Sequence, residues 1–226
     1  MSGSRGVEEE AGGRGVLVVS TSPDAGLPRP GNRTAPTMSH PAPLHPIPVD
    51  RYLAEERDGT VRHEYVDGQL FAMTGARRAH NTVVASIARL LGNALAGGPC
   101  RIAVADMKVQ VAPGRRYYYP DVVVSCDDAD DEPDEYTETR PTLIVEVLSP
   151  TTASTDRREK RVAYLAMASL HDYLIVDPDT GDVEHLSRRG DVWSASSLHA
   201  PHDVVELASF AVTLSLAEVF GAPPAR

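Results

Sequence analysis

The chain has 226 residues, of which 22 are Lys or Arg and 32 are Asp or Glu, for a formal net charge of −10. This length fits one globular domain with a tail, or two small domains. The aliphatic runs, such as 16–19, 143–145 and 174–176, are far shorter than the roughly 20 apolar residues of a membrane span. No apolar segment follows a charged N-terminus, so membrane proteins and secreted proteins are both disfavoured.

The chain contains two cysteines, Cys100 and Cys126. Two are too few for a disulfide framework or for a zinc site built on cysteines. We therefore expect both to be small buried apolar side chains. Because thiols stay reduced in the cytoplasm, we also expect a cytoplasmic protein.

The first 48 residues have the composition of a disordered segment. They hold eight prolines and seven glycines, with four acidic residues balanced by four arginines, and their apolar run is limited to 16–19. Such a segment buries too little surface to offset its chain entropy. We predict a disordered tail over 1–48 and a folded domain over 49–226. Translation from Met38 in place of Met1 would remove most of the tail.

Apolar patterning in the domain predicts a mixed α/β fold. Helices are expected at 49–57, at 79–96, where apolar residues recur every 3.6 positions, and at 155–168. A hairpin with strands 61–65 and 69–73 turns at Asp67 and Gly68. The further strands and a last helical turn are expected at 102–111, 117–124, 142–148, 173–177, 183–186, 192–194 and 216–220. We place 102–111, 117–124 and 142–148 in one central sheet.

One segment accounts for most of the net negative charge. Eight acidic residues, and no Lys or Arg, fall within 127–138. The segment lacks the glycine of a calcium-binding loop, so we interpret it as a solvated loop. An alternative is that it repels an anionic ligand until it moves aside.

Glu146 lies inside the apolar segment 143–148. Because side chains alternate across a strand, it shares its face with Ile144 and Leu148, while the opposite face is wholly aliphatic. A carboxylate buried there costs on the order of several kcal/mol unless a cation or hydrogen-bond donors compensate it. Glu146 is therefore a candidate site residue; the simpler interpretation is a strand-end Glu paired with an arginine.

Asp121 is the second candidate, because Pro120 leads it directly into the apolar run 122–124. Pro120 removes a backbone donor and favours an extended entry, so Asp121 is expected at a strand end or bulge. Two carboxylates on neighbouring strands repel each other unless a cation lies between them, and oxygen-only ligation suits Mg²⁺ or Mn²⁺. The alternative is an Asp that caps a turn.

Lys160 is the third candidate, since Lys108 and Lys160 are the two lysines among the 22 basic residues. A lysine kept against this arginine bias indicates a site that needs a compact ammonium. In a helix that begins near Asp156, the side chains of Asp156, Lys160 and Tyr164 share one face. That face is expected over the end of the Glu146 strand. The alternative is an Asp–Lys pair on the helix surface.

These residues belong to an ordered set of motifs that resembles a known family. The chain resembles the Uma-two family of restriction endonuclease-like proteins, a branch of the PD-(D/E)xK nuclease superfamily, over roughly residues 45–220. The matching segments are 62–68, 75–81, 106–109, 119–121, 143–150 and 156–160 followed by Tyr164. The resemblance implies a restriction endonuclease-like core, in which a mixed central sheet is flanked by helices, with a helix and hairpin at its N-terminal side.

The resemblance also implies roles for individual residues. Asp121 and Glu146 correspond to the two superfamily acids, and Glu64 to an additional acid from the N-terminal part; all three would be metal ligands. Where the superfamily has a lysine two residues after the second acid, this chain has Leu148. Relatives carry that lysine on the following helix, which points to Lys160.

Two further residues are weaker candidates. The triplet Asp106-Met107-Lys108 matches (D/E)xK literally but precedes Asp121, which is the wrong order, so Lys108 is kept for phosphate contact alone. His80, near the start of a helix, is typical of a capping or packing histidine, although it could face the cleft. A positive rim for DNA is expected from seven arginines: Arg77, Arg78, Arg115, Arg116, Arg157, Arg158 and Arg161.

The resemblance implies a Mg²⁺-dependent endonuclease that hydrolyses DNA phosphodiester bonds, with Mn²⁺ able to substitute. Its partner would be DNA, with no membrane, and a homodimer is compatible with it. The acidic charge argues against tight phosphate binding. Two alternatives stay open: a weak or inactive nuclease-fold module for nucleic-acid or protein binding, and a metal-free hydrolase that uses the two acids as acid and base.

Overall fold

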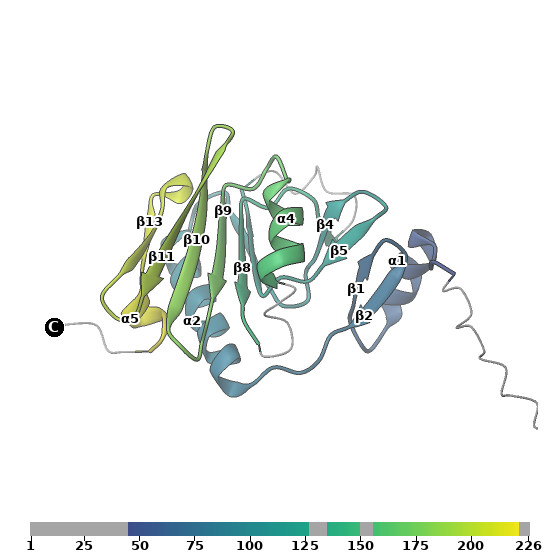
Figure 1. The fold of residues 1–226 in the computed structure, drawn as a ribbon, viewed down its shortest axis with the longest axis horizontal. Helices are drawn as coiled ribbons and strands as arrows, with labels where there is room; N and C mark the ends of the chain where they lie inside the picture. The colour runs from purple at the N-terminus through teal and green to yellow at the C-terminus, as the bar shows by residue number, and fades with distance from the viewer. Residues whose placement is uncertain (1–44, 127–134, 150–155, 222–226) are drawn as a thin grey trace, which may run out of the picture. The chain divides into compact units, whose positions relative to one another are not determined.

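The computed structural model describes residues 45–126, 135–149 and 156–221 (Figure 1). All of them belong to one unit that spans 44–226. Most of the predicted acidic loop, namely 127–134, and most of the predicted tail, 1–44, lie outside the described residues. Among the described helices, none is both long and apolar enough to cross a membrane.

A six-stranded sheet forms the centre of the domain, with the strand order β11-β10-β9-β8-β6-β3. Strands β8 and β9 are parallel, and the other neighbours are antiparallel. The bounds are β3 (Arg101–Val104), β6 (Val122–Ser125), β8 (Leu143–Val147), β9 (Asp172–Val176), β10 (Asp182–Arg189) and β11 (Val192–His199).

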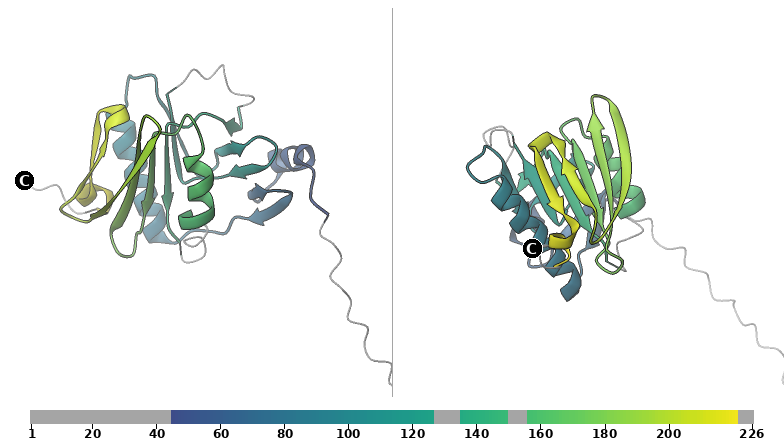
Figure 2. Two further views of the ribbon diagram at one scale, coloured as in Figure 1. Left: turned by 45° about the horizontal axis from the view of Figure 1, so that its top comes forward. Right: turned by 90° about the vertical axis from the view of Figure 1, so that its left-hand side faces the viewer.

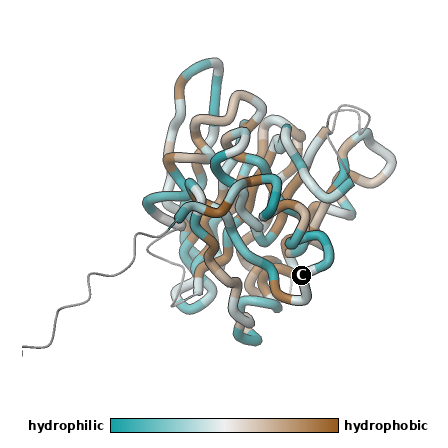
Figure 3. Tube along the Cα trace, turned by 90° about the vertical axis from the view of Figure 1, so that its right-hand side faces the viewer, coloured by the Kyte–Doolittle hydropathy of each residue, from teal (hydrophilic) through white to brown (hydrophobic). Residues whose placement is uncertain are grey.

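Both faces of this sheet are covered, which explains the continuous apolar runs of its central strands. One face packs against α2 (Arg78–Ala94), α5 (Leu216–Val219) and the hairpin of β12 (Val204–Leu207) and β13 (Val212–Ser215). The other face packs against α4 (Arg161–Leu165) (Figure 2). Apolar segments gather inside the domain and hydrophilic ones lie at its turns (Figure 3).

A second, five-stranded sheet has the order β2-β1-β5-β4-β7. Its strands are β1 (His63–Val66), β2 (Gln69–Ala72), β4 (Lys108–Ala112), β5 (Arg116–Tyr118) and β7 (Thr137–Glu138). Helix α1 (Val49–Asp58) packs on it through three tyrosines, Tyr52, Tyr65 and Tyr117. This arrangement confirms the predicted N-terminal helix and hairpin.

The β1–β2 turn explains where the domain begins. Asp67 and Gly68 have φ angles of 47° and 90°, the positive values that a two-residue hairpin turn requires. A Cβ on Gly68 would lie 2.3 Å from the Cβ of Pro46. Ile47 donates its N–H to Gly68 O and accepts a hydrogen bond from the Tyr65 hydroxyl. Pro46 and Ile47, which the prediction assigns to the tail, therefore pack against the hairpin.

The two sheets are connected by breaks within two segments that were each predicted as one strand. Segment 102–111 divides into β3 and β4 at Ala105, whose φ is 62°, and 117–124 divides into β5 and β6 at Tyr119–Asp121. The Ala105 N–H donates to Asp121 O, so the two breaks lie side by side. The prediction of two uninterrupted strands is wrong because each chain segment passes from one sheet to the other.

Other predicted bounds also change. The helix expected at 155–168 is a π-helical turn, η2 (Asp156–Lys160), continued by α4, and it ends at Leu165. The strand expected at 192–194 extends to His199, and the β12–β13 hairpin was not predicted. At the end of the predicted acidic loop, β7 pairs in parallel with β4.

The prediction for the cysteines is wrong. Cys100 and Cys126 are half-buried and form a disulfide, with their Cα atoms 4.0 Å apart. Cys100 directly precedes Arg101 and Cys126 directly follows Ser125, and these two strand residues are partners across β3 and β6. The strand register therefore brings the two thiols together.

Candidate active site

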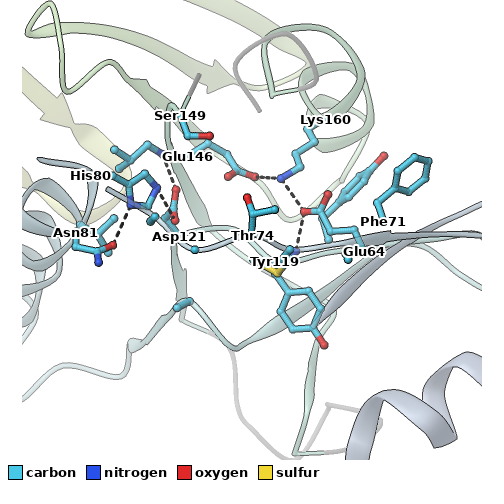
Figure 4. A pocket seen from close by; sticks show the side chains of 18 of the residues that line it. Glu64, Phe71, Thr74, His80, Asn81, Tyr119, Asp121, Glu146, Ser149 and Lys160 are labelled. Carbon is cyan, nitrogen blue, oxygen red and sulfur yellow. Dashed lines mark hydrogen bonds and ion pairs between the residues drawn. The ribbon is translucent and has the colours of Figure 1, made fainter. Parts of the chain in front are cut away.

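A pocket of about 460 Å³ lies where the two sheets meet (Figure 4). The four predicted site residues, Glu64, Asp121, Glu146 and Lys160, all line it. Each comes from a different element: β1, the break before β6, β8 and the end of η2. The fold therefore brings together residues that are almost 100 positions apart in the chain.

Glu146 is buried on the face of β8 that was predicted. Ile144 and Leu148 belong to the apolar cluster on the α4 side, whereas the other side chains of the strand pack on the α2 side. Glu146 is 3% exposed. Its Oε1 accepts hydrogen bonds from Lys160 Nζ at 3.1 Å and from the Tyr164 hydroxyl at 2.9 Å. The buried carboxylate is therefore compensated by an ammonium and a hydroxyl group.

Lys160 and Tyr164 reach Glu146 from one helix face, as their spacing of four residues predicts. Lys160 is 4% exposed, and its Nζ lies 5.6 Å from the centre of the Tyr118 ring. Burial raises the pKa of the Tyr164 hydroxyl well above its usual value, and the Glu146 carboxylate adds to this effect. Tyr164 therefore stays protonated and donates to Glu146.

Glu64 binds the same ammonium from the opposite side. Its Oε1 lies 2.7 Å from Lys160 Nζ and accepts a hydrogen bond from Tyr119 N at 3.3 Å. Lys160 thus joins one carboxylate from each sheet (Figure 4). Two anions around one buried cation hold the ammonium in a fixed position.

Asp121 stands just before β6, at the strand end where it was predicted. Val122 pairs with Val145, so Asp121 and Glu146 occupy facing positions on adjacent strands. Asp121 Oδ2 accepts a hydrogen bond from Val147 N at 2.7 Å. Its Oδ1 lies 3.2 Å from Nε2 of His80. The backbone and a histidine therefore orient this carboxylate.

His80 faces the pocket from the first turn of α2. The hydrogen bond with Asp121 raises the pKa of the His80 imidazole, although burial opposes this. Nδ1 of His80 lies 3.2 Å from Oδ1 of Asn81. Of the two interpretations that the sequence left open, the structure supports the one in the cleft. The contact with Asp121 could not be read from the sequence, because it joins two elements about 40 positions apart.

The donor chemistry of this site suits a hard divalent cation. Asp121 and Glu146 offer carboxylate oxygens from facing positions of two buried strands. Within 45–126, 135–149 and 156–221, no three His, Cys, Asp or Glu side chains are grouped closely enough to hold a metal by themselves. Mg²⁺ typically takes one or two protein carboxylates and completes its shell with water and substrate phosphate. Two such carboxylates therefore suit Mg²⁺, and Asp121, Glu146 and Glu64 as metal ligands stay predictions.

Other residues around the pocket depart from the predictions. Lys108 is buried on β4, with its Nζ 5.8 Å from the centre of the Tyr52 ring, and it is not part of the pocket wall. Its predicted phosphate contact is therefore wrong. Phe71 and Met73, on and after β2, line the pocket although both are exposed, Phe71 by 51%. The sequence of this short strand did not indicate that the two side chains would line a pocket.

Comparison with known proteins places the chain in a family. A model of the Uma2 family, described as "Putative restriction endonuclease", matches residues 49–218. The chain belongs to the Uma2 family. It is 34% identical to the uncharacterized protein slr1290 of Synechocystis sp. over 181 residues, which cover 79% of this chain and 94% of the relative. A second Synechocystis protein, sll1609, is 31% identical over 157 residues, or 69% of this chain and 89% of the relative.

A solved structure shares the fold of this Uma2 chain. It is the crystal structure of a protein from Anabaena variabilis described as a "putative nuclease belonging to DUF820". The two structures superpose with a TM-score of 0.65 at 18% sequence identity, over 78% of this chain and 99% of the other. The restriction endonuclease-like mixed α/β fold is thereby confirmed. Family and fold together support a nuclease role, and with it a nucleic-acid substrate.

Proposed function

We propose that this Uma2 protein is a Mg²⁺-dependent endonuclease that hydrolyses DNA phosphodiester bonds, with Mn²⁺ able to substitute for Mg²⁺. The observation that carries the proposal is the buried ammonium of Lys160, which contacts Glu146 and Glu64 at the wall of a pocket that also holds Asp121. A cation and several carboxylates converging on one cavity are the groups that phosphoryl transfer requires.

Asp121 and Glu146 are the residues that would hold the metal. When bound, a divalent cation supplies an activated water and neutralises charge on the scissile phosphate. The backbone N–H of Val147 keeps Asp121 oriented, and the Tyr164 hydroxyl keeps Glu146 oriented. Both carboxylates are thus fixed before a substrate arrives, which reduces the cost of reorganisation.

Lys160 is proposed to stabilise negative charge on the phosphate, or to orient the attacking water. A lysine ammonium acts as a compact point charge with three donors, so it can keep one carboxylate contact and donate to an oxygen of the substrate. Glu64 positions this ammonium from the other sheet. Lys160 therefore replaces the lysine that the superfamily pattern expects at Leu148.

A plasmid-nicking assay tests this function. Purified protein is incubated with supercoiled DNA in Mg²⁺, in Mn²⁺ or in EDTA, and the relaxed product is quantified. We expect nicking with either metal and none in EDTA. Lys160→Met should lower the rate at least about 10²-fold, while Arg189→Gln, an exposed substitution at the β10–β11 turn, should leave it unchanged. Nicking that persists in EDTA would contradict the metal requirement.

Calorimetric titration with Mg²⁺ separates the nuclease from a non-catalytic module. The nuclease requires a Mg²⁺ site that Asp121→Ala abolishes, together with cleavage by the unsubstituted protein. Metal binding by folded protein without cleavage of any DNA would instead support a binding module. Cleavage without metal binding would support the two acids acting as acid and base.

A further inference from the structure

The exposed face of α2 carries an open groove beside the pocket. Its volume is about 590 Å³, and it is lined by Arg78, Asn81, Thr82, Ala85, Ser86 and Arg89. These positions form a single stripe along the helix, because they recur at spacings of three and four. The small side chain of Ala85 leaves room between the two long arginines. We name this stripe the arginine groove.

The arginine groove lies within a segment that has no negative charge. Between Asp67 and Asp106 the sequence has no Asp or Glu, but it has four arginines. A surface helix usually carries both signs of charge, and this chain has an excess of ten acidic over basic residues. The charged and polar groups of the groove are guanidinium, amide and hydroxyl groups, with no carboxylate among them, and this favours an anionic ligand.

Most arginines of the predicted positive rim are already engaged. Arg77 pairs with Asp179, Arg115 and Arg116 pair with Asp67, and Arg161 pairs with Glu184. The side chain of Arg157 lies outside the described part of the structure. By contrast, Arg78 and Arg89 are exposed and form no ion pair with any described residue. Their charges remain available to an external anion.

The groove and the pocket share a residue. Asn81 lines both of them, and it neighbours His80, which contacts Asp121. An extended anion bound along α2 would therefore reach the pocket that holds Asp121. The guanidinium-bearing positions 78 and 89 are separated by about 16 Å of helix rise. Two arginines at this separation suit an extended polymer of phosphates better than a single phosphate.

We propose that the arginine groove of α2 binds the phosphodiester backbone of DNA and guides one strand towards the pocket. This inference rests on the proposed nuclease function, for which it supplies the substrate-binding surface. Arginine, asparagine, serine and threonine side chains are the usual donors to DNA phosphates. Contacts of this kind carry little sequence information, so the groove would orient DNA without selecting a base sequence.

Binding measured without cleavage tests the arginine groove. In the Glu146→Gln background, fluorescence anisotropy of a labelled DNA duplex is recorded over a series of salt concentrations. We expect Arg78→Gln/Arg89→Gln to weaken binding about 10-fold and to lower the slope of log affinity against log salt by about 1 per arginine. Arg78→Lys/Arg89→Lys should keep the slope, since it keeps the charges. Arg189→Gln is the matched control, an exposed arginine at the end of β10 in the β10–β11 hairpin (Figure 1), not on α2.

Each outcome decides between the two proposals. An unchanged affinity and salt slope in the double glutamine variant, with DNA still bound and cleaved by the unsubstituted protein, would overturn the groove and leave the nuclease intact. Absence of DNA binding by the unsubstituted protein would overturn both. In cleavage assays, the double glutamine variant should raise KM and leave kcat unchanged, as expected for uniform binding. Melting curves that match the parent exclude misfolding as the cause.

Discussion

The two ends of the six-stranded sheet use buried polar groups in opposite ways. At one end, Asp121 and Glu146 face a pocket, together with His80 and Lys160. At the other end, Asp172 at the start of β9 pairs with His185 of β10, with 2.8 Å between His185 Nε2 and Asp172 Oδ1. Asp172 is 2% exposed and does not line that pocket.

The comparison shows that burial of a charge does not by itself mark a functional site. Asp172 is as deeply buried as Glu146, and its Oδ2 has no hydrogen-bond partner among the described residues. The second end also carries the Cys100–Cys126 disulfide and the buried hydroxyl of Ser125. What distinguishes the first end is convergence: charged groups from several elements meet at a cavity large enough for a ligand.

The largest expected effect is a difference in DNA nicking between substitutions of Glu146 and of Asp172. Glu146→Gln should lower DNA nicking at least about 10³-fold, because it removes a metal ligand and the anionic partner of Lys160. Asp172→Asn, the same change at the opposite end, should leave the nicking rate close to that of the parent. Supercoiled plasmid in Mg²⁺ provides the measurement for both. Equal losses of nicking rate in the two variants would contradict the view that only the Glu146 end of the sheet takes part in cleavage.

The next effect concerns stability at the Asp172 end. His185→Leu should lower the free energy of unfolding by about 3 kcal/mol, because it leaves the buried Asp172 carboxylate without its hydrogen-bond partner. Urea unfolding followed by circular dichroism measures this. In the double variant Asp172→Leu/His185→Leu much of the loss should be recovered, since an apolar pair needs no compensation. A double variant less stable than the single one would show that the pair is required for stability.

A smaller effect is expected at the disulfide. Reduction, or Cys100→Ser, should lower the free energy of unfolding by about 2 kcal/mol, since the cross-link restricts the unfolded chain. The nicking rate of the folded protein should not change, because the bridge lies at the end of β6 opposite to Asp121. Loss of nicking at unchanged stability would show that the disulfide end of the sheet also contributes to activity.

The smallest effect is expected for Ser125. Its Oγ is buried without a hydrogen-bond partner among the described residues. Ser125→Ala should therefore change the free energy of unfolding by no more than about 0.5 kcal/mol, in either direction, because no hydrogen bond is lost. Thermal melting measures the change. A loss above about 2 kcal/mol would reveal a hydrogen bond to this hydroxyl.

Local patterns predicted the parts of the site that depend on a single element. Alternation within 143–148 placed Glu146 on the face of Ile144 and Leu148, and helical spacing placed Lys160 and Tyr164 on one side. Both are consequences of backbone geometry, which a short window of sequence contains. The same holds for the hairpin turn at Asp67.

Features that depend on long-range pairing were not predicted. The division of two segments between sheets at Ala105 and Asp121 follows from which strands pair, and an apolar run does not encode its partner. The Cys100–Cys126 bond likewise depends on the register of β3 with β6, across 26 positions. His80 was left open because its contact with Asp121 arises where α2 meets the sheet junction.

The position of Lys160 also has a consequence for finding similar enzymes. Its amine reaches Glu146 from 14 residues further along the chain, and reaches Glu64 from a different sheet. Searches that demand a fixed interval between acid and base overlook such a protein. A three-dimensional template made from one amine and its two carboxyl neighbours would recover it, because such a template does not depend on how many residues separate the three side chains.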